Sequence, residues 1–345
     1  MTESASLLRT ALNRVLDGKN LDESQASDAL RALTDEDVPP ALAASLLTAL
    51  RMKGETAAEI RGFATAMRDL ARRPDIADTT GAIDIVGTGG DGSGSFNIST
   101  GSALLTAACG VPVIKHGNRS VSSKSGSADV LETLGLPMPL DEAAAARALE
   151  ASGFTFLFAP YYHPAMKAVA PVRQAMGIRT LFNILGPLTN PAAPPYFLLG
   201  AFSLPVAKLM ADALAGMQIE RAFVIHGEPG WDEATPVGVY DLFDVRDGKV
   251  SHERRDPRDE KFARCTPEDL AGGDAQFNAR CLRDVLTGKD LGAHYDALVL
   301  GASLALEVTG TTTSRRAAIA HAREAINAGR GRELLDKLSA VGAAS

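Results

Sequence analysis

A glycine-dense stretch of the sequence has the composition of a loop that holds phosphate. The stretch GTGGDGSGSFNIST, at positions 87–100, follows the apolar run AIDIV at 82–86. Glycines allow backbone N–H groups to converge on an anion, and a helix that begins after the loop adds the positive end of its dipole. The spacing is neither GxGxxG nor that of a P-loop, so no Rossmann or P-loop assignment follows. The alternative is a flexible turn with ordinary helix caps.

A second polar stretch follows the next apolar run. It reads KHGNRSVSSKSGSADVLETLG at 115–135, after VPVI at 111–114, and it opens a predicted helix at Ser127 or Asp129. Open α/β sheets bind ligands beyond the carboxyl ends of their strands, so we expect both polar stretches at one edge of a sheet. There they can surround a ligand that carries several phosphates. A solvated loop is the alternative interpretation of the second stretch.

Two further patterns add a candidate metal site and a candidate carboxylate site. Asp232 and Glu233, in GWDEATP, follow the apolar run 221–225, and adjacent loop carboxylates suit Mg²⁺, which prefers oxygen ligands and bridges substrate phosphates. Arg173 lies on a predicted helical segment that restarts at Pro171, where a guanidinium can clamp a carboxylate in two-pronged fashion. Taken alone, a solvated acidic pair and a surface or capping arginine are the more ordinary interpretations.

The elements that must position these residues fall into two predicted domains. Residues 1–73 show helical spacing, with capping-box patterns at Asp22–Gln25 and Thr56–Glu59, and predict a small all-helical domain. From residue 74 to 345, apolar runs alternate with helical patterns, which predicts a larger α/β domain with a mostly parallel central sheet. Asp247-Gly248 predicts a hairpin. The runs predicted as parallel strands are 82–86, 111–114, 154–158, 196–202 and 221–225.

Composition and charge exclude several functional classes. Over 345 residues, 35 Lys and Arg against 42 Asp and Glu give a net charge of −7, which disfavours a nucleic-acid partner. Three cysteines without CxxC spacing indicate neither a disulfide framework nor a thiolate zinc site. The first residues lack a signal-peptide pattern, and the apolar stretch 41–50 is about half the length of a membrane span. We therefore expect a cytoplasmic protein without a membrane partner.

Taken in order, these motifs resemble the anthranilate phosphoribosyltransferase family. The resemblance covers most of the chain, and the segment KHGNR…SGSAD joined to RTxFNxLGPLxNP is highly specific. The matching stretches are 87–91, 96–100, 115–132, 163–173, 179–191, 232–233 and 267–279. The resemblance implies a nucleoside phosphorylase/phosphoribosyltransferase-like fold in which helices from about 165–190 complete the small domain. It also implies a homodimer formed through the small domains.

The reaction that the resemblance implies is transfer of the 5-phosphoribosyl group of phosphoribosyl pyrophosphate to the amine of anthranilate, in tryptophan biosynthesis. The residue chemistry fits, because release of pyrophosphate requires stabilisation of a departing polyanion and positioning of the amine. One rival is a pyrimidine nucleoside phosphorylase, which Arg173 and KHGNR disfavour because a neutral base needs no carboxylate clamp. The other is a non-catalytic nucleic-acid-binding relative, which the net charge and the intact loops disfavour.

The resemblance also implies individual residue roles. Gly87, Asn118 and Arg173 would bind anthranilate, with Arg173 facing its carboxylate, and Ser99, Asp232 and Glu233 would hold Mg²⁺ as the cofactor. The implied ligands of phosphoribosyl pyrophosphate are Gly87, Gly90, Asp91, Ser95, Asn97, Ile98, Ser99, Thr100, Lys115, His116, Gly117, Asn118, Arg119, Ser120, Val121, Ser122, Ser123 and Ser127.

His116 and His163 are the candidates for proton transfer. An aromatic amine attacks in its neutral form, so strong base catalysis is unnecessary, and the favoured role of both histidines is to line the acceptor pocket or hold structure. The sequence departs from the family pattern at Trp231, at 259–265 and at Gly301. These departures leave room for a paralogue with an altered acceptor preference.

Overall fold

The N-terminal region consists of helices whose ends are where the sequence predicts them. A computed structural model describes residues 2–120 and 124–343. Both predicted capping boxes form, with Asp22 and Thr56 at the N-caps of the second and fourth helices. Gly54 ends the third helix with a φ of 87°, which glycine adopts readily. The helices are α1 (Glu3–Leu16), α2 (Glu23–Leu33), α3 (Pro40–Lys53) and α4 (Ala57–Asp69).

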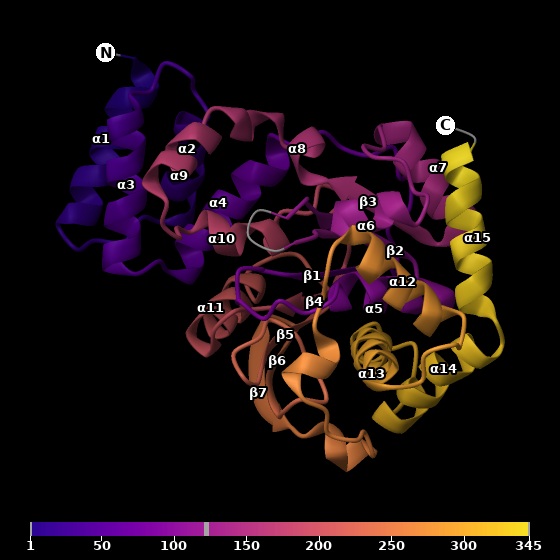
Figure 1. The fold of residues 1–345 in the computed structure, drawn as a ribbon. Coiled ribbons are helices and arrows are strands. Elements are labelled where there is room, and N and C mark those ends of the chain that lie inside the picture. The colour runs from indigo at the N-terminus through magenta and orange to yellow at the C-terminus, as the bar shows by residue number, and fades with distance from the viewer. Residues whose placement is uncertain (1, 121–123, 344–345) are drawn as a thin grey trace.

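The larger region is built on one mostly parallel sheet. Its strands are β1 (Ile83–Gly87), β2 (Val113–Gly117), β3 (Phe154–Phe158), β4 (Tyr196–Gly200), β5 (Arg221–Gly227), β6 (Tyr240–Arg246) and β7 (Lys249–Arg255). Within the described residues they lie in the order β3-β2-β1-β4-β5-β6-β7 (Figure 1). β1 to β5 pair in parallel, and β6 and β7 form the predicted hairpin. The predicted fold class is therefore confirmed.

Helices and short 3₁₀ turns connect these strands, and further ones follow β7. The helices are α5 (Ile98–Ala108), α6 (Ser127–Thr133), α7 (Glu142–Ser152), α8 (Ala159–Tyr162), α9 (Ala170–Met176), α10 (Phe182–Leu185), α11 (Leu204–Leu214), α12 (Ala275–Leu286), α13 (Ala293–Val308), α14 (Arg315–Asn327) and α15 (Arg330–Ala343). The 3₁₀ turns are η1 (Pro164–Lys167), η2 (Gly186–Leu188), η3 (Pro257–Glu260) and η4 (Pro267–Leu270). Among the described residues, none of these helices combines the length and apolarity that crossing a bilayer requires.

Two hydrophobic cores lie against the two faces of the sheet, because alternate residues of a strand point to opposite faces. Leu198 of β4 belongs to a core shared with α5 and α12–α15. Its neighbours Phe197 and Leu199 belong to the other core, which α11, α9, α10 and the N-terminal helices complete. The N-terminal region is thus continuous with the sheet through α11, and the domain boundary at 73/74 stays a prediction.

The strand order creates a switch point between β1 and β4. The chain passes from β1 to β2 and β3 on one side, then returns to place β4 on the other side of β1. In open α/β sheets the crevice at such a point, beyond the carboxyl ends of the strands, is where ligands bind. β1 ends there at Gly87, which is paired in register with Gly200 of β4. The predicted phosphate loop therefore begins at the switch point.

Candidate active site

Asp232 lies directly over the switch point, and glycine is required on both strands beneath it. A Cβ atom at Gly87 would lie 2.3 Å from Asp232 Oδ2, and one at Gly200 would lie 1.7 Å from the Asp232 backbone oxygen. Neither distance is compatible with a side chain. The two strand ends therefore carry glycine because the loop that follows β5 rests on them.

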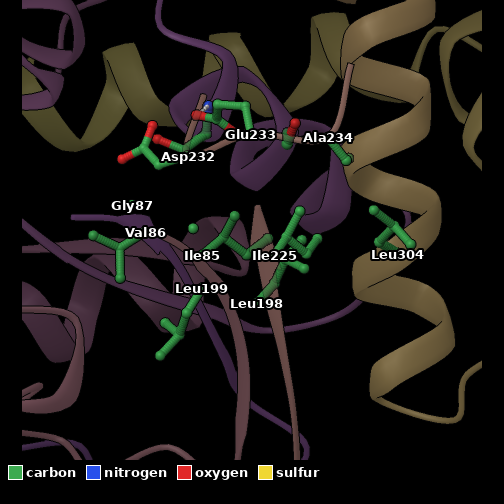
Figure 2. A pocket seen from close by; sticks show the side chains of 14 residues that line it. Ile85, Val86, Gly87, Leu198, Leu199, Ile225, Asp232, Glu233, Ala234 and Leu304 are labelled. Atoms are coloured by element: carbon green, nitrogen blue, oxygen red, sulfur yellow. Dashed lines mark hydrogen bonds between the residues drawn. The ribbon is translucent and has the colours of Figure 1, made fainter. Parts of the chain in front are cut away.

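Hydrogen bonds join Asp232 to the glycine-rich loop. Its Oδ2 accepts from the backbone N–H of Gly89 at 2.6 Å. In return, the backbone N–H of Asp232 donates to Oδ2 of Asp91 at 3.2 Å. Figure 2 shows the carboxylates of Asp232 and Glu233 above the apolar strand residues Ile85, Leu198 and Ile225. Two loops that are about 140 residues apart in sequence thus form one surface.

Glu233 and Lys115 extend this cluster to the start of α5. Oε1 of Glu233 accepts from the backbone N–H of Ser99 at 3.1 Å. Nζ of Lys115 donates to the carbonyl of Ile85 and to Ser99 Oγ, the latter at 3.4 Å. Asp91, Lys115 and Asp232 therefore surround one site, as expected if the predicted loops share a ligand. The ligand role of each residue stays a prediction.

Burial and mutual repulsion destabilise the negative charge in this cluster. The pKa of Asp232 rises to about 7, chiefly because the carboxyl is buried and secondly because Asp91 is close. Burial, followed by the charge of Asp232, raises the pKa of Glu233 well above its usual range. Burial lowers the pKa of Lys115, while Asp84, Glu233 and Asp232 oppose that shift. A cation bound between the carboxylates would relieve this repulsion.

The donor set fits Mg²⁺ that is held partly by substrate and water. Within residues 2–120 and 124–343, no three His, Cys, Asp or Glu side chains form a complete metal-binding group. Mg²⁺ does not need one, since it commonly binds one or two carboxylates, several waters and substrate phosphates. The oxygens of Asp232 and Glu233, with Ser99 beside them, supply that kind of partial set. A cavity of about 20 Å³ beneath them holds roughly one water molecule.

The start of α5 also contacts the second polar stretch and α12. Thr100 Oγ1 donates to Ser127 Oγ at 3.0 Å, which joins the first loop to α6. Asn97 Oδ1 accepts from Asn278 Nδ2 at 2.7 Å. Sequence reasoning did not assign Asn278 to the site, although it lies in the matching stretch 267–279. Because that contact spans 181 positions, no local pattern predicts it.

Some of the other residues predicted to bind phosphoribosyl pyrophosphate have side chains that are buried in the core or paired with other residues. Ile98 is buried in the core, so only its backbone is available to a ligand. Arg119 is paired with Asp129 at 2.6 Å and Glu132 at 2.9 Å, and these hydrogen bonds raise its pKa. The remaining predicted positions divide by location. Gly90 and Ser95 lie in the glycine-rich loop, Gly117 ends β2, and Asn118 and Ser120 follow it, while Val121, Ser122 and Ser123 lie outside the described residues.

His116 and His163 form a buried pair. Their ring centroids are 5.0 Å apart in an edge-to-face arrangement. His116 Nδ1 lies 3.2 Å from the carbonyl oxygen of Gly186, and among the described residues neither Nε2 atom has a hydrogen-bond partner. Burial lowers the pKa of His163 to about 4 and lowers that of His116 well below its usual range. Both rings are therefore neutral at pH 7 and are weak bases, which agrees with a lining role.

A buried carboxyl, Asp84, fixes the backbone next to this pair. Its Oδ1 accepts from the backbone N–H of His116 at 3.1 Å, and its Oδ2 accepts from Asn190 Nδ2 at 2.9 Å. Asn190 also donates to the carbonyl of Ile114 at 2.8 Å. Burial raises the pKa of Asp84 to about 6, and the Lys115 charge opposes this shift. Asp84 thus ties β1, β2 and the segment before β4 together.

Arg173 lies on α9, in a segment that packs with the N-terminal helices. Its guanidinium carbon lies 5.0 Å from the ring centroid of Phe182, and burial lowers its pKa. Among the described residues, no carboxylate lies within ion-pair distance of Arg173. A guanidinium that is half-buried without an acidic partner is suited to an anionic ligand. Its role with anthranilate stays a prediction.

Comparisons with known proteins match both regions of the chain. Residues 79–332 match the model of the glycosyl transferase family, a/b domain, and residues 9–71 match that of the glycosyl transferase family, helical bundle domain. An anthranilate phosphoribosyltransferase of Rubrobacter xylanophilus is 42% identical, over 97% of each chain. This chain belongs to the anthranilate phosphoribosyltransferase family.

Solved structures of this family have the same fold. The enzyme from Thermus thermophilus is 42% identical, with a TM-score of 0.90 over 96% of this chain and 99% of its own. The enzyme from Saccharomyces cerevisiae, in complex with PRPP and Mg, is 26% identical, with a TM-score of 0.90 over 100% of this chain and 99% of its own. The departures from the family pattern at Trp231, 259–265 and Gly301 stay predictions. Trp231 is buried beside Asp232, and a Cβ at Gly301 would lie 2.1 Å from Ser102 Oγ.

The buried neutral state of His163 predicts how stability depends on pH. Its folded pKa of about 4 lies below the ordinary value of 6.5, so the unfolded chain binds the proton first as pH falls. Stability is therefore lost from about pH 6.5 downward, by roughly 2 kcal/mol at pH 5 for this one group. We expect His163→Asn, which cannot titrate in this range, to lose less stability than the native chain between pH 7 and 5. Urea unfolding at both values measures the difference, and equal losses would contradict the assignment.

Proposed function

We propose that this chain transfers the 5-phosphoribosyl group from phosphoribosyl pyrophosphate to the amine of anthranilate, in tryptophan biosynthesis. The products are N-(5-phosphoribosyl)anthranilate and pyrophosphate. The observation that carries the proposal is the buried pair Asp232 and Glu233 at the switch point, hydrogen-bonded to the glycine-rich loop and to the start of α5. Family membership supports the same reaction. A phosphorylase or a nucleic-acid-binding role has no comparable support.

The donor would lie along the carboxyl edge of the sheet. Gly87 lets Asp232 rest on the strand end beneath it, and the glycine-rich loop and the start of α5 present backbone N–H groups beside it. Lys115 holds Ser99 from below through its contact with Ser99 Oγ. The yeast relative was solved with PRPP and Mg, which supports a donor site of this kind. Bound Mg²⁺ supplies positive charge that stabilises the leaving pyrophosphate.

The acceptor would be placed by Arg173 and Asn118. Arg173 would grip the carboxylate of anthranilate, which directs the amine toward C1 of the donor. The amine attacks in its neutral form, and its surplus proton is lost after the new C–N bond forms and the C–O bond to pyrophosphate breaks. Neutral His116 and His163 shape this side of the site and exclude water.

We also propose that the chain forms a homodimer through its N-terminal helices. Leu16 at the end of α1 and Met52 near the end of α3 are 66% and 82% exposed, which leaves apolar surface on these two helices. A second copy would cover them. The particle mass in solution, by light scattering, tests this proposal.

The function is tested by the fluorescence of anthranilate. We expect the signal to fall when the purified protein is mixed with phosphoribosyl pyrophosphate and Mg²⁺, because the amine is converted to its phosphoribosyl derivative. The assay should be run beside substituted benzoates and free pyrimidines, since the departures from the family pattern that we expect at Trp231 and Gly301 leave room for another acceptor. Absence of turnover at every magnesium concentration would refute the proposed reaction.

Asp232→Asn tests the metal assignment. An amide keeps the size of the side chain but removes the charge that attracts Mg²⁺, so we expect the magnesium concentration for half-maximal rate to rise about tenfold or more. Asp244→Asn, in the hairpin strand β6, is a control for removal of a carboxylate far from the loop. If Asp232→Asn needed the same magnesium concentration for half-maximal rate as the native chain, this result would count against the assignment.

Arg173→Ala tests the acceptor assignment. Loss of a two-pronged ionic hydrogen bond costs roughly 2–3 kcal/mol, so the anthranilate KM should rise by roughly 30-fold to 150-fold. The KM for phosphoribosyl pyrophosphate should change little. Arg254→Ala, at an exposed position on β7, should leave both constants unchanged. An unaltered anthranilate KM in Arg173→Ala would overturn the clamp.

A further inference from the structure

Arg179 is a second arginine of the 163–191 segment, and it contacts the glycine-rich loop at Gly90, next to the residues that contact Asp232. It lies between α9, which ends at Gly177 in the left-handed conformation, and α10. Its backbone is held by the N-terminal helices, because Arg51 Nη1, in the last turn of α3, donates to the Arg179 carbonyl at 2.5 Å. The backbone of Arg179 therefore follows the position of α3.

The side chain of Arg179 is held by the larger region instead. Its Nη2 donates to the carbonyl of Gly90. Its guanidinium carbon lies 4.3 Å from the ring centroid of Phe202, just after β4. Phe202 is itself joined to the glycine-rich loop, since its backbone N–H donates to Thr88 Oγ1 at 3.1 Å. One residue thus bridges the N-terminal helices and the phosphate loop.

The loop that Arg179 contacts is the one whose shape matters for the donor. Gly90 has a φ of 70°, and a Cβ there would lie 3.4 Å from Arg179 Nη2. On its other side, the same turn is fixed by Asp232, which accepts from Gly89 and donates to Asp91. Residues 89–91 are therefore held between two contacts, one from the β5 loop and one from Arg179.

We propose that Arg179 is a positioning residue that couples the N-terminal helices to the glycine-rich loop, so that the donor site depends on where those helices lie. The proposal rests on the proposed function in one respect, that this loop binds pyrophosphate. It also links the two substrates, because Arg173 lies on α9 and Arg179 lies in the connection that follows α9. Movement of α9 on binding an acceptor would be passed to the donor loop through Arg179.

Binding of Mg²⁺ and pyrophosphate, measured by calorimetry, tests this coupling without turnover. Trp231, the single tryptophan of the chain, is buried next to Asp232, so its emission gives a second, local signal. We expect Arg179→Ala to weaken binding about tenfold, the loss typical of one charged hydrogen bond. Lys208→Ala, at an exposed position on α11, should bind as the native chain does.

The double variant distinguishes coupling from two independent effects. Arg51→Ala should weaken binding severalfold, and Arg51→Ala/Arg179→Ala should bind no worse than Arg179→Ala, because both changes cut the same connection. Arg179→Lys keeps the charge but loses the planar group that stacks on Phe202, so it should bind like Arg179→Ala. Unchanged unfolding midpoints would show that the variants are folded.

The outcomes separate this proposal from the proposed function. The coupling alone would be overturned if Arg179→Ala or Arg179→Lys bound pyrophosphate as tightly as the native chain does. It would also be overturned if the loss of affinity in the double variant equalled the product of the losses in the two single variants. Absence of pyrophosphate binding by the native chain in the presence of Mg²⁺ would instead contradict the donor site, and the coupling with it.

Discussion

The contact of Asp232 with the ends of β1 and β4 is the constraint on which the site depends. The loop after β5 can rest on the sheet only because Gly87 and Gly200 carry no side chains. Once it rests there, its carboxylates are buried and repel each other, which raises their pKa values. The fold thus buries two carboxylates that repel each other at a position where a bound cation would stabilise both. Because Asp232 also accepts a hydrogen bond from the backbone of the glycine-rich loop, the same contact fixes the shape of that loop.

The N-terminal helices take part in the site through the segment that returns to them. α9 brings Arg173, and the residues that follow it bring Arg179 to Gly90. The groups proposed to bind acceptor and donor therefore come from different regions of the chain, joined by one short connection. This arrangement explains why an enzyme that must bring two substrates together is built from a helical region and a sheet.

The sequence predicts those parts of the structure that depend on the spacing of nearby residues. The strands, the capping boxes and the hairpin at Asp247-Gly248 follow from short-range spacing, and they form as predicted. The convergence of the polar loops also follows, because parallel strands end at one edge. Contacts between distant positions do not follow from spacing. Asn278 with Asn97, Asp84 with Asn190 and Arg179 with Gly90 are fixed only by tertiary packing, and Arg119 turns toward Asp129 because α6 offers it two carboxylates.

The shared core around α11 limits how this chain can be divided. Met210 and Leu214 of α11 pack in the same core as Ile60 and Met67 of α4, and a Cβ at Gly216 would lie 2.7 Å from the side chain of Arg61. Removal of the first 73 residues would expose that side of α11 to water and leave an apolar surface that is prone to aggregation. The helical region is therefore not a detachable module, and a recombinant fragment or a domain exchange with a relative would have to carry α11 along with it.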